Sequence, residues 1–360
     1  MRRTGTHMQI LYLSNRPAVL RETLEHVRHF MPWVDDVVVL APEATLARLR
    51  QELDGPFTGL AEEELLARGE LDELAATDHS SRNTVLRVAA ARRAPLADVH
   101  LASDDDYRPL KPIEPTTFVE DGRYVGHVSY DLALWRRNET SFDAAQHASY
   151  QALSYLGCEH LSYAAHMPQV MDRRVVVEAF DAVGRLTDSM QFCEWTIPFN
   201  WGRRHHPELF AEPRTFVTMC WPRYPHEWPF WVRPDEYAFE NFYPELYRPG
   251  HLFDGIPTGL DPERVERHSF DKMLRWYRFD LDAGRLRFPD DVANPWLGDG
   301  GTGRGRARRA FFSALRPVRR AYEYLALEER TQLAELAGSI ARLERQEERR
   351  AADPTVVDEP

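Results

Sequence analysis

Short apolar runs alternate with amphipathic helical stretches in the first third of the chain, and this alternation constrains the fold more than any other feature. The runs lie at residues 8–13, 37–40 and 99–102, and a helical pattern over 18–30 separates the first two. Strands that are apolar throughout are typical of a parallel sheet with helices on both faces. The sequence therefore predicts an α/β domain with a mixed, mostly parallel sheet flanked by helices.

Changes in composition along the chain predict how it is divided. We assign residues 8–297 to one main domain, in which 192–257 is dense in Trp, Pro, Tyr and His and predicts a loop-rich lobe. The aromatic rings of this lobe are either buried core or a platform that stacks on sugars. A Gly-rich stretch at 298–305 indicates a flexible linker, 306–350 a helical region and 351–360 a disordered tail.

Charge and composition exclude several classes of partner and location. The formal net charge of -12 argues against a protein that binds bare nucleic acid, because phosphate contacts depend on clustered Lys and Arg. Three irregularly spaced cysteines and the lack of a long apolar run favour a cytoplasmic protein. The basic stretch 304–320 suits either a peripheral contact with the inner membrane face or packing on protein. An apolar stripe over 322–349 is suited to a homo-oligomer.

Three consecutive carboxylates are the strongest candidate for chemistry. Asp104, Asp105 and Asp106 lie at the carboxyl end of the predicted strand at 99–102, after Ser103. In open α/β sheets, ligands bind at the carboxyl ends of the strands. Carboxylate oxygens are preferred ligands of Mg²⁺ and Mn²⁺, so the triplet predicts a divalent metal site beside a phosphorylated ligand. The alternative is an exposed acidic turn or helix cap without ligands.

Several basic or polar side chains are candidates for binding the same ligand. Arg16 follows the first predicted strand, and Arg82 with Asn83 begins a predicted helix, where backbone amides also attract phosphate. Arg203 opens the basic turn 203–206, which could meet a diphosphate or an anionic acceptor. For Arg82 and Asn83 the alternative is helix capping and surface charge, and for the turn it is an exposed basic loop.

Three segments, in this order, resemble the conserved blocks of the Stealth family of sugar-phosphate transferases. They span residues 16–42, 78–113 and 142–183 and so cover the first half of the chain. The motifs that carry the resemblance are Leu20-Arg21-Glu22-Thr23-Leu24 and Pro32-Trp33-Val34, then Ser80-Ser81-Arg82-Asn83 and Arg108-Pro109-Leu110, then Leu156-Gly157 and Ala165-His166-Met167-Pro168.

This resemblance implies a GT-A-like fold and a metal-dependent transfer of a sugar 1-phosphate from a nucleotide-diphosphate sugar to a glycan or cell-surface polymer. Stealth sites place Asn before two aspartates, and here either Ser103 or Asp104 fills that place, so the metal-binding pair stays open. We also assign Asp105 a catalytic role. Together with the resemblance, a histidine pKa near neutrality suits His166 as a general base or phosphate ligand, and the alternative for His166 is a structural role.

Two other functions fit the same residues. An ordinary glycosyltransferase would transfer the sugar itself and release a nucleoside diphosphate, whereas sugar-phosphate transfer releases a nucleoside monophosphate. A protein of another class would keep the sheet but act as an inactive glycan-binding or scaffold protein. The nucleotide that is released, or the absence of release, separates the three.

Overall fold

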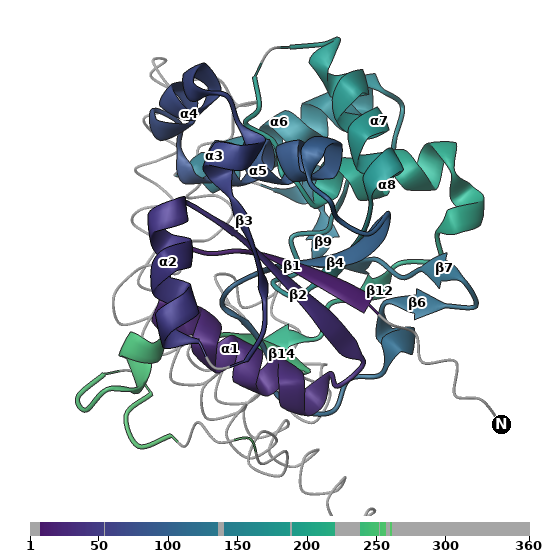
Figure 1. The fold of residues 1–360 in the computed structure, drawn as a ribbon. Helices are drawn as coiled ribbons and strands as arrows, with labels where there is room; N and C mark the ends of the chain where they lie inside the picture. The colour runs from purple at the N-terminus through teal and green to yellow at the C-terminus, as the bar shows by residue number, and fades with distance from the viewer. Residues whose placement is uncertain are drawn as a thin grey trace, which may run out of the picture.

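The computed structural model describes residues 8–53, 55–135, 140–187, 189–219, 238–251, 253–256 and 260. Its centre is a five-stranded sheet with the strand order β11-β4-β1-β2-β3 (Figure 1). Four of these strands run parallel, and β11 is antiparallel to β4. The predicted mixed, mostly parallel sheet is confirmed. The strands are β1 Met8–Leu13, β2 Val34–Ala41, β3 Thr58–Ala61, β4 Val99–Asp104 and β11 Gln169–Asp172.

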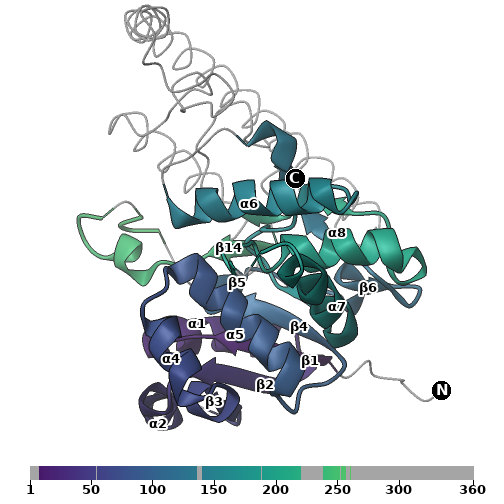
Figure 2. The same cartoon turned by 90° about the horizontal axis from the view of Figure 1, so that it is seen from above.

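Helices cover both faces of the sheet, with α1 on one face and α5 on the other (Figures 1 and 2). Leu11 and Leu13 of β1 pack in the cluster that contains α5, while Ile10 and Tyr12 pack with α1. Alternate side chains of one strand are thus buried on opposite faces, which explains the continuous apolar run. The helices are α1 Pro17–Phe30, α2 Glu43–Glu52, α3 Glu62–Leu65, α4 Arg68–Ala75, α5 His79–Arg93, α6 Ser141–Tyr155, α7 Arg173–Gly184 and α8 Thr196–His205.

A second, smaller sheet begins just after the end of β4. In it β5 (Tyr107–Pro109) pairs with β14 (Phe239–Asn241), which also pairs with β13 (Thr218–Met219). The other short strands are β6 Val119–Glu120 with β7 Arg123–Tyr124, β8 His127–Val128 with β12 Arg214–Thr215, and β9 Tyr130–Asp131 with β10 Leu161–Ser162. Single turns of 3₁₀ helix are η1 Pro115–Thr117, η2 Leu132–Leu134, η3 Pro207–Leu209 and η5 Pro244–Tyr247.

Several local predictions differ from the structure. Strand β3 is not among the predicted apolar runs; it pairs with β2 as an edge strand and is too short to leave a periodic signal. Within the predicted loop-rich lobe at 192–257, α8 is a regular helix. Much of that lobe and the predicted linker, helical region and tail (298–305, 306–350 and 351–360) lie outside the described residues, as do 304–320 and 322–349. The assignment of 8–297 to one domain stays a prediction.

Across the described ranges, no helix is long and apolar enough to cross a membrane.

His100, buried in β4, predicts a loss of stability in mild acid. Burial lowers its pKa from 6.5 to about 4, with Arg87 and Arg173 adding to the effect and Asp172 opposing it. Because the unfolded state then binds the proton more tightly, we expect the free energy of unfolding to fall as the pH drops from about 6.5 to 4, by roughly 3 kcal/mol for this residue.

The measurement is urea unfolding of wild type and His100→Gln at pH 7.5 and pH 5. The loss on acidification should be smaller in the variant, and His29→Gln, at an exposed position, should behave as wild type. An equal loss in wild type and His100→Gln would contradict the assignment.

Candidate active site

The candidate site lies at the carboxyl ends of β1 and β4, which are parallel neighbours with Leu13 opposite Asp104. Helix α1 leads from β1 to β2 on one side, whereas β4 lies on the other side of β1. This is the point where the strand order reverses, and at such points open α/β sheets leave a crevice for ligands. The fold therefore brings Ser14 and Arg16, which follow β1, next to the three aspartates.

Asp105 is buried, and both of its oxygens are engaged. The Ser14 hydroxyl donates to Oδ2 at 2.7 Å, Arg16 Nε donates to the same oxygen at 3.2 Å, and Arg16 Nη2 donates to Oδ1. Thr23 of α1 also donates to the backbone carbonyl of Asp105, at 2.6 Å. Burial raises the pKa of Asp105, and Arg16 opposes this shift. Asp105 thus holds Arg16 against the acidic turn.

Asp106 shares Arg16 but has fewer partners. Its Oδ2 lies 3.1 Å from Arg16 Nη2, and its side chain is 10% exposed. Burial raises the pKa of Asp106 to about 7, the charge of Asp104 adds to this, and Arg16 opposes it. A carboxylate in such surroundings is stabilised by an additional cation.

Asp104 faces α5 and belongs to a second cluster. Arg87 Nη2 donates to Asp104 Oδ1 at 2.5 Å and to the carbonyl of Ser103 at 3.1 Å. Glu194 and Trp195, just before α8, contact the same guanidinium, at 3.6 Å from Nε and 4.1 Å from the ring centroid. Burial raises the pKa of Glu194, with Asp104 adding and Arg87 opposing. Sequence reasoning missed Arg87, Glu194 and Trp195.

Two of the three aspartates could supply carboxylate ligands to a cation. Among the described residues, no group of three or more His, Cys, Asp or Glu could hold a metal ion. Mg²⁺, however, is commonly bound by one or two carboxylates together with substrate phosphates. Asp104 and Asp106 retain exposed side-chain surface, 24% and 10%, whereas Asp105 is committed to Arg16 and Ser14. The donor set therefore fits Mg²⁺ or Mn²⁺ as a pair rather than a triplet.

His166 lies beside Tyr107, the residue after this turn, and its environment differs from the expected one. Its ring makes an edge contact with Tyr107 at a centroid distance of 5.9 Å, and its backbone is left-handed, with φ of 51°. Burial lowers the pKa of His166 to about 4, and the charge of Asp104 opposes this shift. The expected pKa near neutrality is therefore corrected, and the imidazole is neutral at neutral pH.

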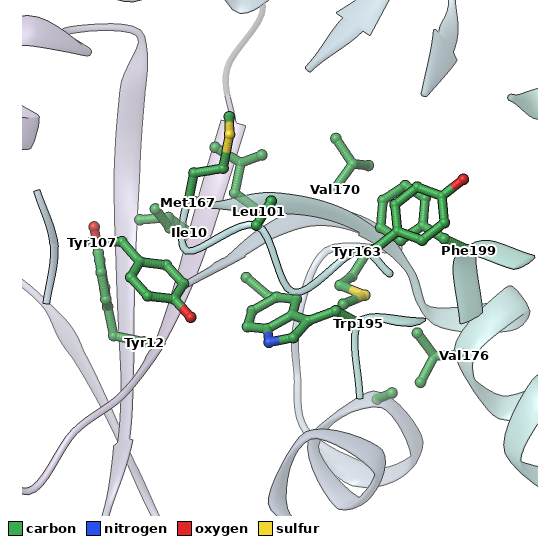
Figure 3. Close-up of a cluster of buried hydrophobic side chains, with 14 of the residues drawn as sticks. Ile10, Tyr12, Leu101, Tyr107, Tyr163, Met167, Val170, Val176, Trp195 and Phe199 are labelled. Carbon is green, nitrogen blue, oxygen red and sulfur yellow. The ribbon is translucent and has the colours of Figure 1, made fainter. Parts of the chain in front are cut away.

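An apolar layer packs against the acidic turn. Figure 3 shows Tyr107 and Trp195 close to one another, with Met167, the neighbour of His166, above them. The centroids of the Tyr107 and Trp195 rings are 6.5 Å apart. Tyr107 is the first residue after the acidic turn, so this packing fixes the turn against the segment that carries Glu194.

The remaining predicted ligand-binding residues lie in three different settings. Asn83 is partly exposed on α5, one turn before Arg87, and its amide lies 3.5 Å from His79 Nε2. Arg82 points toward α3 and pairs with Glu62 at 2.5 Å. The N-cap of α5 is Asp78, which accepts hydrogen bonds from the backbone amides of Ser80 and Ser81.

Arg203 is not brought to the acidic turn. It lies in the last turn of α8, roughly 12 Å along the helix axis from Trp195, given a rise of about 1.5 Å per residue. Its guanidinium binds Glu159 at 3.0 Å and the carbonyl of Ala211 at 3.0 Å. The predicted basic turn is thus the end of a helix whose arginine has structural partners, and His206 pairs with Glu178.

No family model and no curated protein match this chain. Among solved structures, it is similar to the galactosyltransferase LgtC in complex with donor and acceptor sugar analogues, at 16% identity and a TM-score of 0.40, over 73% of this chain and 96% of that one. It is also similar to mouse xyloside xylosyltransferase 1, at 14% identity and a TM-score of 0.34, over 61% and 87%. At these TM-scores the similarities carry no conclusion about activity.

Proposed function

We propose that this chain is a Mg²⁺- or Mn²⁺-dependent transferase that moves a sugar 1-phosphate from a nucleotide-diphosphate sugar to a hydroxyl of a glycan or cell-surface polymer. One observation supports this above all others: at the reversal point of the sheet, Asp104 ends β4 opposite the end of β1, and Arg16, which follows β1, pairs with Asp106. The resemblance of three segments to Stealth transferases supports the choice of reaction.

Both negative and positive side chains at this edge suit a donor diphosphate. Arg16 is 43% exposed beyond its contacts with Asp105 and Asp106, so its guanidinium can reach a phosphate oxygen. Asn83 is partly exposed one turn before Arg87 on α5, so its side-chain amide could also contact the donor. A divalent cation held by Asp104 and Asp106 would offset the charge of the diphosphate when bound.

The reaction follows from this placement of the donor. The acceptor hydroxyl oxygen attacks the β-phosphorus, a new oxygen–phosphorus bond forms, and the bond from that phosphorus to the bridging oxygen breaks. The nucleoside monophosphate leaves with the bonding electrons, and the hydroxyl proton goes to the neutral imidazole of His166. In this assignment Asp105 acts through Arg16, because it holds the guanidinium next to the turn.

The test is to identify which nucleotide is released. Purified protein is incubated with Mn²⁺, a panel of nucleotide-diphosphate sugars and glycan acceptors, and the products are separated by chromatography. Acceptor-dependent release of a nucleoside monophosphate supports the proposal, and His166→Ala should reduce it by about 100-fold or more, in the range of general base catalysis. EDTA should abolish it.

Two outcomes would contradict the proposal. Release of a nucleoside diphosphate would indicate transfer of the sugar itself. Neither release nor Mn²⁺-dependent binding of any donor would indicate a glycan-binding or scaffold protein. Reactions without acceptor control for simple hydrolysis of the donor.

A further inference from the structure

Arg87 is a buried cation at the site to which the proposed reaction assigns no role. Its side chain is only 5% exposed, in the middle of α5. Taking a guanidinium out of water costs several kcal/mol, so such a residue is kept only where charged partners compensate it. Those partners are Asp104 and Glu194, two carboxylates of the acidic cluster.

The contacts of Arg87 restrain Asp104 in two ways. One nitrogen, Nη2, donates to the Asp104 carboxylate and also to the carbonyl of Ser103, so side chain and backbone are fixed together at the end of β4. The Trp195 ring lies against the guanidinium at 4.1 Å, which restrains its plane. The orientation of the Asp104 carboxylate is thus set by three segments that are distant in sequence.

Glu194 completes this arrangement by its charge. Arg87 alone would neutralise Asp104 and weaken the attraction of Asp104 for a cation. With Glu194 present, four carboxyl groups (Asp104, Asp105, Asp106 and Glu194) face two guanidiniums (Arg16 and Arg87), so the cluster carries a formal charge of -2 when all four are ionised. A divalent cation balances that charge.

We propose that Arg87 is a positioning residue for the cation site: it orients Asp104, Trp195 holds the guanidinium plane, and Glu194 restores the negative charge. This inference rests on the proposed function, because it needs a cation at Asp104. Arg87 acts indirectly, because its side chain is only 5% exposed and is paired with Asp104. Its effect passes through Asp104.

The choice of variants follows from the geometry of the guanidinium. Lysine keeps the positive charge but cannot stack as a plane on Trp195 or reproduce the guanidinium's fork of N–H donors. Arg87→Lys therefore separates positioning from charge, and Arg87→Met removes both. Arg173→Lys is the matched control. Like Arg87, Arg173 donates to backbone carbonyls, those of Ala91 and Leu96, but these lie outside the acidic turn.

The experiment measures the affinity for Mn²⁺ by electron paramagnetic resonance, with inorganic pyrophosphate as a mimic of the donor diphosphate. We expect Arg87→Lys and Arg87→Met to weaken Mn²⁺ binding by about 10- to 100-fold, the range for residues that orient metal ligands, and Glu194→Gln by about 10-fold. Arg173→Lys should bind Mn²⁺ as wild type does. Circular dichroism at each step shows which variants are folded.

The outcomes separate this inference from the proposed function. If wild type binds Mn²⁺ and Asp104→Asn does not, but folded Arg87→Lys binds normally, the positioning role is wrong and the metal site stands. If wild type binds no Mn²⁺, both the positioning role of Arg87 and the proposed metal-dependent function are wrong. Should both Arg87 variants fail to fold, Glu194→Gln decides, because unchanged Mn²⁺ binding in that variant contradicts the charge balance.

Discussion

Asp104→Asn is expected to abolish Mn²⁺-dependent donor binding and to reduce transfer by on the order of 10³-fold, comparable to the loss of one strong electrostatic contact to the reacting groups. The amide is neutral and a poorer ligand for a hard cation. The change also leaves Arg87 next to Glu194 alone. Initial rates and Mn²⁺ titrations of the purified variant check both effects.

Asp181→Asn is the matched control for this change. Asp181 also pairs with an arginine of α5, Arg92, but its side chain is 54% exposed and lies away from the acidic turn. The same chemical change at this position should leave Mn²⁺ binding and transfer unaltered. An Asp104→Asn variant with undiminished Mn²⁺ dependence would remove the central support of the proposed function.

The second large effect concerns stability. Arg108→Met is expected to lower the free energy of unfolding by about 3–5 kcal/mol, the cost of breaking a buried ion pair from one side. Arg108 and Glu240 are each 1% exposed, and Arg108 Nε donates to Glu240 Oε1 at 2.9 Å. The guanidinium also lies 3.8 Å from the centroid of the Phe242 ring. The variant leaves the Glu240 carboxylate buried without this cation, and urea unfolding measures the loss.

A double variant tests the cause of that loss. Arg108→Met combined with Glu240→Gln removes both charges, so it should be more stable than Arg108→Met alone, and the two changes should not add. Arg214→Met is the control, because its pair with Glu120 is about half exposed and should contribute less than about 1 kcal/mol. Additive losses in the double variant would show that packing, not charge, dominates.

Local sequence patterns were sufficient to predict those helices and strands whose periodicity can be read from neighbouring residues. The run at 8–13 is strand β1, and the helical pattern at 18–30 differs from α1 by one residue at its start. The position of the aspartates at a strand end followed for the same reason. The pairing of β14 with β5 left no such signal, because it joins residues at least 130 positions apart and depends on which face each segment buries.

The acidic triplet also combines a part that the sequence predicts with a part that only tertiary packing decides. Its sequence indicated a cation-binding edge, but three consecutive side chains point in different directions, and only packing decides their partners. Asp105 turns to Ser14 and Arg16 after β1, whereas Asp104 turns to Arg87 on α5. Arg87 had a faint signal as a charged residue on an apolar helix stretch, while Glu194 had none.

The sequence by itself determined the α/β class, most helices and strands of the central layer, and the edge at which acidic residues gather, because strand and helix periodicity and chain order are local properties. Only the tertiary structure decided which carboxylates remain accessible to a cation, that His166 is held neutral by burial, and that Arg203 lies elsewhere. These depend on burial and on charges brought together from distant segments, and no local pattern encodes those distances.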